Sequence, residues 1–258
     1  MDAASRIIIV LKVELRALAR QLFLQLPTPK NSTMKRYLLF LPALLLTLLT
    51  GCLREDSENV NQDRIWAHYE MFYDANEDIT YARATFRFGH AAGTKLDLTE
   101  PSEVRFNGDP IPFREGLAYY EEDYAGFVDA GTFEFQDLND NIYINDVSIN
   151  TIEFPADFGP IDQNASFDLI WDGDPLQNHE AVSVWLNGIN EGDAQLFLEG
   201  SEGAAGILLG MDNLQELPVG TTSAVIERTY APPIQEGTEV GGLINGRYRG
   251  TSVDVEIE

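Results

Sequence analysis

The chain has only one cysteine, Cys52, among its 258 residues, so no disulfide can form within it. It also lacks the motifs of several enzyme classes. There is no HExxH pair for zinc, no Gly-x-Ser-x-Gly turn for a nucleophilic serine and no glycine-rich phosphate loop between a strand and a helix. The three histidines, His68, His90 and His179, are isolated. These absences disfavour an enzyme and leave a body that its hydrophobic core must hold together.

Basic residues are scarce as well, since 17 lysines and arginines stand against 42 aspartates and glutamates. Residues 1–51 hold seven of the basic and two of the acidic residues, which leaves 10 basic and 40 acidic residues and a formal charge of −30. Such a surface repels nucleic acid and anionic lipid, which excludes nucleic acid as a partner. Screening by high salt is the favoured explanation, and bound divalent cations are the alternative. Crowded carboxylates are expected to bind protons more tightly when folded, so mild acidification should stabilise the protein.

An apolar run precedes the cysteine. It follows Lys35 and Arg36, covers residues 37–49 and ends in small residues. A basic start, an apolar stretch of about a dozen residues and a small-residue cleavage site are the parts of a secretory signal. The run contains Pro42 and is shorter than the span of about 20 residues that crosses a membrane. We therefore predict a signal peptide at residues 34–51, with an uncleaved membrane anchor as the alternative.

The residues Leu49-Thr50-Gly51-Cys52 resemble the lipobox of bacterial lipoproteins. The resemblance implies type II cleavage between Gly51 and Cys52, after which Cys52 carries a diacylglyceryl thioether and an N-acyl chain. Two or more acyl chains anchor a protein stably, whereas one holds it only marginally. The partner that the resemblance implies is therefore the lipid bilayer.

Two segments flank the signal peptide. Residues 1–33 are interpreted as a mis-assigned start upstream of Met34, or as a long basic leader that is removed with the signal. Residues 52–63 are polar and acidic, so they are predicted to form a lipidated, flexible tether. The residue after Cys52 is Leu53, whereas in the best-known lipoprotein sorting rule an aspartate there retains a protein at the inner membrane. This difference favours the outer membrane.

The tether also contains the acidic cluster Glu55, Asp56 and Glu58. This cluster resembles the surface-export signal of lipoproteins in some Gram-negative bacteria, although a solvated spacer would have the same composition. We expect a lipid-anchored protein of the outer membrane, on its periplasmic face or at the cell surface.

From Trp66 onward, apolar residues alternate with polar ones, which is the pattern of half-buried strands. The pattern predicts strands at residues 65–73, 79–88, 94–98, 103–106, 133–135, 142–144, 147–154, 167–171, 181–186, 194–198, 224–230 and 252–257. Asn107-Gly108, Asn245-Gly246 and residues 172–175 are predicted turns. The mature chain shows a short helical turn, at residues 211–217, and no longer helical period.

Many short strands separated by turns are typical of a β-sandwich. The length fits two tandem sandwiches of about 100 residues each. We predict an all-β fold with domains at residues 64–154 and 155–258, divided where a strand ends and Pro155 follows. The second half is similar to an immunoglobulin-like sandwich, with Trp171 in a strand. One continuous sandwich is the alternative, and the body matches no family by its motifs.

One segment could bind a metal. Residues 137–141, Asp-Leu-Asn-Asp-Asn, match the calcium-linker motif of cadherins, and Asp137, Asn139 and Asp140 would supply the oxygen ligands that calcium prefers. The other acidic residues of a cadherin site are not found. Because the segment lies between two strand patterns, a hairpin turn is the favoured interpretation. No other cofactor is expected.

A second segment could contact substrate or ligand; it contains Tyr119, Tyr120, Glu121, Glu122, Asp123 and Tyr124. Two carboxylates facing each other across a cleft could serve glycoside hydrolysis. Tyrosines beside carboxylates are also typical of sugar-binding surfaces. A solvated acidic run and an ordinary sheet are the simpler interpretations.

The sequence as a whole predicts a membrane-anchored bacterial lipoprotein. We expect it to act as a non-enzymatic binding or assembly module of the cell envelope, with an unknown protein or glycan as its partner. The alternative is a surface hydrolase or glycan-binding protein that uses the exposed carboxylates and tyrosines.

Overall fold

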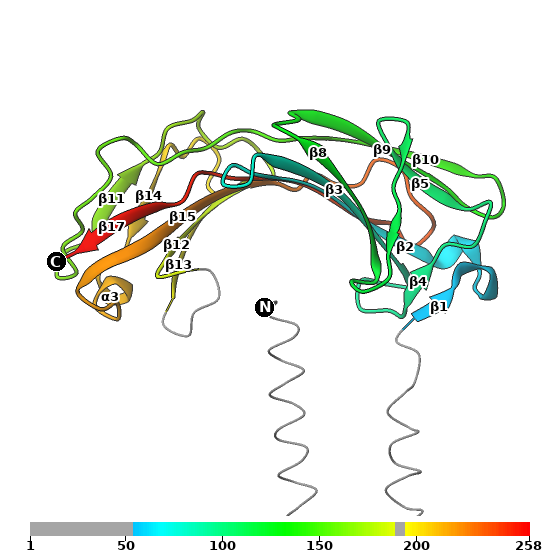
Figure 1. Ribbon diagram of the computed structural model, residues 1–258, viewed down its shortest axis with the longest axis horizontal. Coiled ribbons are helices and arrows are strands. Elements are labelled where there is room, and N and C mark those ends of the chain that lie inside the picture. Colours follow the sequence, from blue (N-terminus) through cyan, green and yellow to red (C-terminus); the bar gives the residue numbers. More distant parts are fainter. Residues whose placement is uncertain (1–53, 189–193) are drawn as a thin grey trace, which may run out of the picture. The chain divides into compact units, whose positions relative to one another are not determined.

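The computed structural model of the protein describes residues 54–188 and 194–258 (Figure 1). The predicted upstream start at residues 1–33, the predicted signal peptide at 34–51 and the predicted lipidation site Cys52 lie outside these residues. In the part that is described, no helix is long and apolar enough to cross a membrane.

Strands dominate the described chain, which confirms the predicted all-β fold. The first half contains β1 (Arg54–Asp56), the 3₁₀ turns η1 (Ser57–Asn59) and η2 (Gln62–Arg64), β2 (Ile65–Asp74), β3 (Ile79–Phe88), β4 (Lys95–Asp97), β5 (Glu103–Phe106), β6 (Asp109–Pro110), β7 (Phe113–Arg114), β8 (Tyr119–Ala125), β9 (Ala130–Gln136) and β10 (Ile142–Ser148). The second half contains β11 (Phe167–Ile170), β12 (Glu180–Leu186), β13 (Gln195–Glu199), β14 (Gly206–Leu209), α3 (Met211–Leu214), β15 (Gly220–Tyr230), β16 (Gly242–Arg249) and β17 (Val253–Ile257). Strands β3 and β5 have the predicted bounds.

The strands form one large sheet and two small ones. The large sheet has eleven strands in the order β1-β4-β3-β2-β16-β15-β12-β13, with β7 and β8 added at β3 and β17 added at β15. The small sheets are β10-β9-β5-β6 and β11-β14. Figure 1 shows them lying over different ends of the large sheet. We call the covered side of the large sheet its inner face and the opposite side its outer face.

Aromatic side chains join the layers at the β2–β3 end. The ring of Tyr69 in β2 stacks on Phe133 in β9, with 5.1 Å between ring centroids. Phe86 in β3 meets Phe135 in β9 at 4.5 Å. All four side chains belong to one buried hydrophobic cluster that extends along the body. Burial of such apolar area, at about 25 cal/mol per Å², is the main force that holds the sheets together.

The division into two sandwich domains after Phe154 is not supported. Strand β16, from the second half, pairs in parallel with β2, from the first, over the register Gly242↔Ala67 to Arg249↔Asp74. The buried cluster includes residues of both halves, and the described residues 54–188 and 194–258 belong to one compact unit. An eleven-stranded sheet also differs from the immunoglobulin arrangement, whose two sheets hold about three to five strands each. The continuous arrangement follows from a strand pairing between distant segments, which local patterns do not encode.

The predicted tether needs a correction over its described part. Residues 54–56 form β1, which pairs in parallel with β4. The Ser57 side chain is fully buried, and its hydroxyl accepts a hydrogen bond from the Thr99 amide at 2.9 Å. The Gln62 amide donates to the Ser57 carbonyl at 2.7 Å. Most polar residues of the segment are exposed, but Ser57 and Gln62 are buried, and their side chains accept hydrogen bonds from the Thr99 and Leu138 amides of the body.

Turn predictions had mixed outcomes. Asn107 and Gly108 have φ values of 50° and 89° and join β5 to β6, so the hairpin prediction is confirmed. Asn245-Gly246 lies in the middle of β16, so the turn predicted there is wrong. Glycine is needed at position 246 because the Ser148 backbone passes close to it, and not because the chain turns there.

Candidate functional site

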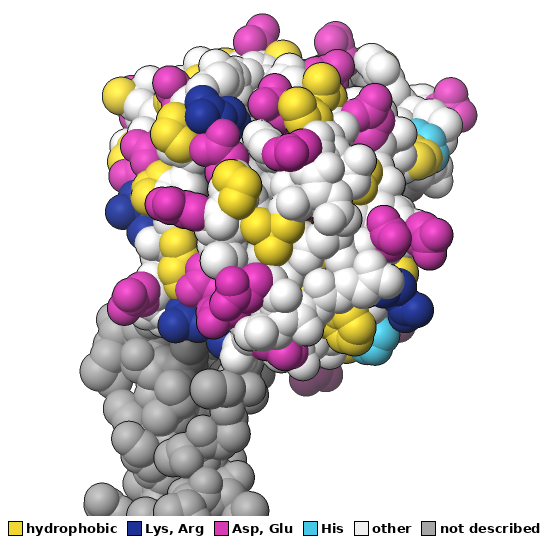
Figure 2. Space-filling view, turned by 90° about the vertical axis from the view of Figure 1, so that its right-hand side faces the viewer, with side chains coloured by type: hydrophobic (Ala, Val, Ile, Leu, Met, Phe, Trp, Pro, Cys, Tyr) yellow, Lys and Arg dark blue, Asp and Glu magenta, His cyan; other side chains and the backbone are white. Residues whose placement is uncertain are grey.

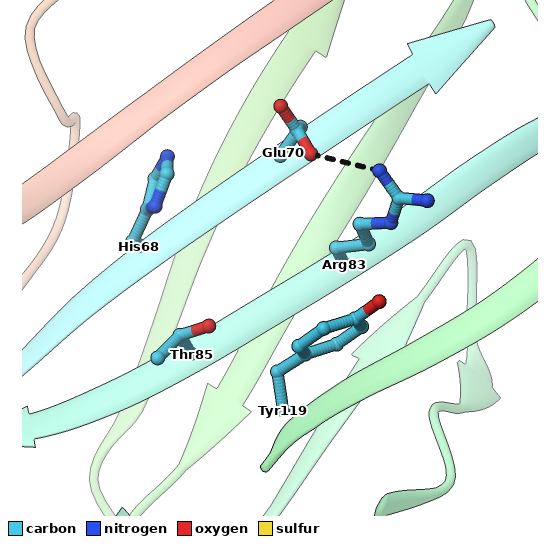
Figure 3. A pocket seen from close by; sticks show the side chains of 5 residues that line it. All are labelled: His68, Glu70, Arg83, Thr85 and Tyr119. Atoms are coloured by element: carbon cyan, nitrogen blue, oxygen red, sulfur yellow. Dashed lines mark hydrogen bonds and ion pairs between the residues drawn. The ribbon is translucent and has the colours of Figure 1, made fainter. Parts of the chain in front are cut away.

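A polar pocket of about 220 Å³ opens on the outer face of the large sheet (Figure 3). Its walls are the side chains of His68, Glu70, Arg83, Thr85 and Tyr119. They come from β2, β3 and β8, and the register places His68 opposite Thr85 and Glu70 opposite Arg83. Since side chains alternate between faces, the residues between them point into the core. Strand alternation therefore builds the pocket on three neighbouring strands.

Hydrogen bonds connect one side of the pocket to the next strand. The His68 Nε2 atom lies 2.7 Å from Asn245 Oδ1 in β16. With the amide oxygen facing the ring, Nε2 is the donor of this hydrogen bond. The Asn245 amide donates to Glu70 Oε1 at 3.4 Å. The imidazole is therefore held against the sheet, beside Trp66, whose ring centroid lies 6.1 Å away.

Arg83 connects the carboxylates of this face. Its Nη1 atom lies 3.2 Å from Glu70 Oε2, and its Nε atom lies 2.6 Å from Glu121 Oε2. The Tyr119 hydroxyl donates to the same Glu121 oxygen at 3.2 Å. Figure 3 shows the Arg83 side chain between Glu70 and Tyr119. The guanidinium thus fixes both sides of the pocket by charge-assisted hydrogen bonds.

The ion pairs continue across the outer face. Glu70 also pairs with Arg247 at 3.2 Å, and Arg249 pairs with Asp74 at 2.9 Å and with Glu227 at 2.7 Å. The buried ring of Phe72 lies beneath these arginines, with the Arg247 guanidinium carbon 4.1 Å from the ring centroid. Cation–π contact and ion pairing therefore cover an apolar ring that would otherwise face water.

The electrostatics of Glu70 suit an ion-pair partner better than a proton donor. Burial raises the pKa of Glu70, but Arg247 and Arg83 outweigh burial, so its pKa lies below the ordinary value. The pKa of Tyr119 is raised by burial and by the neighbouring Glu121 carboxylate. At neutral pH the pocket therefore presents a carboxylate, a guanidinium, an imidazole and two hydroxyls. This set suits a small polar ligand, because the volume is below the range of about 300–1,000 Å³ for drug-sized ligands.

The structure separates the residues of the predicted segment 119–124. They form strand β8, paired with β3, and not a solvated run. Tyr119 lines the pocket, whereas Tyr120 is buried and its hydroxyl donates to Asp97 at 3.2 Å. The Tyr124 hydroxyl has no hydrogen-bond partner among the described residues. Glu121 and Glu70 both bind Arg83, so the two carboxylates are joined by a guanidinium.

Most of the pocket was not predicted from the sequence. Of the isolated histidines, His68 lies in it, while His90 and His179 do not line it. The alternation over residues 79–88 was sufficient to place Arg83 and Thr85 on one face. Nothing in the sequence indicated that β2 and β8 would flank that strand.

The predicted calcium segment forms the loop of the β9–β10 hairpin, which is the favoured of its two interpretations. Asp137 is fully buried, and its Oδ1 atom accepts from the backbone amides of Asn139 at 2.8 Å and Asn141 at 3.0 Å. Its Oδ2 atom accepts from the Asn141 side chain at 2.9 Å, and Asp140 accepts from Gln136 at 3.0 Å. N–H donors thus surround the oxygens that a calcium ion would need. Across the described ranges, no group of three or more His, Cys, Asp or Glu side chains is arranged to hold a metal. Calcium at Asp137, Asn139 and Asp140 stays a prediction.

The pKa directions of two glutamates oppose the expectation that acidification stabilises the protein. Both Glu70 and Glu180 have a pKa lowered from 4.5, because arginines and other donors outweigh the effect of burial. A group with a depressed folded pKa stabilises the fold above its unfolded pKa, and loses that contribution as pH falls through the folded value. We therefore expect acidification below 4.5 to lower the melting temperature, instead of raising it.

Thermal unfolding followed by circular dichroism across an acid pH series measures this effect. Each unit of pKa difference corresponds to about 1.4 kcal/mol. The Glu70→Gln variant should lose part of the pH dependence, whereas Glu258→Gln, at an exposed position, should keep all of it. A melting temperature that rises on acidification would show that carboxylate crowding dominates.

No protein-family model matches the chain, and no curated protein sequence matches it. One solved structure that is similar comes from a study of host cell surface retention of a 1.5-MDa bacterial ice-binding adhesin. Its sequence is 12% identical to this chain, and the TM-score is 0.22. The alignment covers 75% of this chain and 66% of that one. A mutant of Salmonella alpha-2-macroglobulin is 8% identical, with a TM-score of 0.21, covering 75% of this chain and 15% of that one. The chain thus spans less than two thirds of either structure, and TM-scores this low carry no argument about function.

Proposed function

We propose that the protein is a lipid-anchored binding module of the bacterial cell envelope, attached to the outer membrane through Cys52. The observation that carries the proposal is the sequence Leu49-Thr50-Gly51-Cys52 at the end of an apolar run, with the only cysteine of the chain at the lipidation position. The body that follows is an all-β sandwich with a polar pocket on its open sheet face. An anchor followed by a β body with an accessible pocket supports binding at the membrane surface.

The pocket supports binding better than hydrolysis. A glycoside hydrolase needs two carboxylic groups, one of them with a raised pKa that lets it donate a proton. The pocket lining contains one carboxylate, Glu70, and its pKa is lowered. Tyr119 offers an apolar ring face beside hydrogen-bonding groups, which is a combination that suits a sugar or another small polar ligand. These features support ligand binding as the role of the pocket.

Replacing Cys52 by alanine is expected to abolish lipid attachment, because the thioether requires the cysteine sulfur. Cells grown with a labelled palmitate analogue should incorporate label into the unchanged protein and none into Cys52→Ala. The variant should also accumulate as a slower-migrating precursor, since type II cleavage follows lipidation. Gel fluorescence with immunoblotting measures both results.

The matched control is Leu53→Asp, which leaves the lipobox intact. It should keep the label, but the sorting rule predicts that the protein moves from the outer to the inner membrane fraction. Equal labelling of the wild type and Cys52→Ala would contradict the proposal.

A further inference from the structure

One turn of the folded body carries the acceptor sequence for N-glycosylation. The residues Asn164-Ala165-Ser166 fit the pattern Asn-x-Ser/Thr, in which x is any residue except proline. No other asparagine after Cys52 is followed by serine or threonine two positions later. Such an acceptor acts on a surface loop of an exported protein. The position of Asn164 in the fold is therefore the first test of the motif.

The motif lies in an exposed turn that no strand covers. The turn follows Ile161, which is buried, and ends at Phe167, where β11 begins. Of the residues 162–166 between them, all but Gln163 are exposed. A transferase can therefore reach the asparagine without separating paired strands.

The turn holds the side-chain amide of the asparagine against a carboxylate. Asp162 Oδ1 accepts from the Asn164 backbone amide at 2.8 Å and from Asn164 Nδ2 at 3.2 Å. An amide nitrogen is a weak nucleophile, because resonance delocalises its lone pair over the carbonyl. A charge-assisted hydrogen bond from this nitrogen to a carboxylate returns electron density to it. Asp162 is thus placed to make the Asn164 nitrogen more reactive.

The serine of the motif has its hydroxyl proton available. Ser166 Oγ accepts from the Met211 amide at 3.2 Å, and the Ser166 hydroxyl donates no hydrogen bond within the described residues. A serine hydroxyl has one donor besides its acceptor lone pairs. This donor can therefore bind a transferase while the turn keeps its folded geometry.

Large apolar side chains are exposed near the turn. Leu208 in β14 is the register partner of Asp168, so it shares a face of this small sheet with Ile170. The exposed fractions are 58% for Leu208, 63% for Ile170 and 37% for Met211, which contacts Ser166. Figure 2, which faces the opposite end of the body, shows apolar side chains interspersed with acidic ones. Gathered apolar side chains promote aggregation, and a bulky hydrophilic glycan at the turn would shield them.

We propose that Asn164 is an N-glycosylation site whose donor is an oligosaccharide linked through diphosphate to a polyprenyl lipid. An oligosaccharyltransferase would join Asn164 Nδ2 to C1 of the first sugar. The bond from C1 to the diphosphate oxygen breaks, and the polyprenyl diphosphate leaves with the electron pair. Nδ2 gives up one proton to a base of the transferase. An exported chain meets its donor at the membrane, which favours a lipid-linked sugar over a soluble nucleotide sugar.

The proposal rests on the export that the function proposed above includes, and it adds a covalent modification to the body. Figure 1 shows β11 at the opposite end of the body from β1, the strand nearest to Cys52 in the chain. The glycan would therefore lie far from the strand that follows the lipid attachment site.

Mass spectrometry of the lipid-labelled protein tests the modification. The protein is purified from the bacterium that encodes it after growth with the palmitate analogue, and is digested with a protease that cleaves before aspartate. Digestion yields the peptide 162–167, in which Asn164 is the only asparagine. We expect this peptide to carry the added mass of several sugar residues, with fragment ions that place the sugar on Asn164.

Variants of the motif separate its parts. Asn164→Gln should lose the added mass entirely, whereas Asn213→Gln, at an exposed asparagine outside the motif, should keep it. Ser166→Ala should lose the added mass, and Ser166→Thr should restore it, because threonine supplies the same hydroxyl. Asp162→Ala should lower the modified fraction, since the hydrogen bond to Asn164 Nδ2 is removed.

The outcomes for the glycan and for the anchor can be told apart. An unmodified peptide 162–167 in protein that carries the palmitate label would overturn the glycosylation proposal and leave the anchor intact. A glycan on Asn164 of protein without the label would support glycosylation and contradict the anchor. Added mass that persists in Asn164→Gln would place the sugar on another residue and overturn the assignment.

Discussion

Replacing Arg228 by methionine is expected to lower the free energy of unfolding by about 3–5 kcal/mol. Arg228 in β15 and Glu180 in β12 form a buried ion pair, with side-chain exposures of 1% and 0% and 2.5 Å between Nη2 and Oε2. Methionine fills a similar volume but removes the positive charge. The Glu180 carboxylate would then remain buried without its counter-ion, which is the costly state.

The geometry explains why this pair is stable in the folded protein. Arg228 Nε donates to Glu180 Oε1 at 3.1 Å, and its Nη1 donates to the Asp174 carbonyl at 2.7 Å. Glu180 also accepts from the Gln177 amide and the Asn150 side chain, both at 2.6 Å. Nearly every polar atom of the pair has a partner, so the favourable contacts offset the cost of removing two charges from water.

Urea unfolding of four proteins measures the prediction: the wild type, Arg228→Met, Glu180→Leu and the double variant. The double variant should be more stable than Arg228→Met, because it leaves no isolated buried charge. Arg228→Met should also gain stability on mild acidification, since burial then raises the pKa of the unpaired Glu180. A loss below about 1 kcal/mol in Arg228→Met would place this pair with weak surface pairs.

Replacing Gly246 by alanine is expected to cost about 3 kcal/mol, at the upper end of the usual cost of overpacking. A Cβ atom on Gly246 would lie 2.0 Å from the Ser148 carbonyl oxygen and 3.2 Å from the Val147 side chain. The first of these is a backbone atom at the end of β10, so no side-chain rotation relieves the clash. Strand β10 would have to move away from β16, and the inner-face packing would open.

Gly210→Ala is the matched control. A Cβ there meets nothing within 4 Å, and the φ of −71° suits alanine. Its stability should stay within about 0.5 kcal/mol of the wild type. Chemical denaturation with unchanged m-values would show that Gly246→Ala acts on the folded state. Equal stabilities of the two variants would mean that the strands separate without cost.

Gly246 also shows how sequence analysis went wrong. Asn-Gly is a strong turn signal, and at residues 107–108 it forms the predicted hairpin. At residues 245–246 the same pair lies within a strand, because another backbone crosses over the glycine. Strand β8 was missed for a related reason. Its acidic residues suggested solvent, but Arg83 on β3 binds Glu121 and Arg114 on β7 binds Asp123. Local pattern does not reveal which segment will lie opposite.

The sequence by itself determined the strand pattern of β3 and β5, the Asn107-Gly108 hairpin and the excess of acidic charge. These depend on neighbouring residues, whose alternation decides which side chains one strand buries. It also supplied the predicted lipobox at residues 49–52, which lies outside the described residues. Only the tertiary structure decided which strands are neighbours. The contact of His68 with Asn245 spans 177 positions, and that of Glu180 with Arg228 spans 48. The pocket and the buried ion pair both depend on such pairings, because a sheet brings together side chains from segments that are remote along the chain.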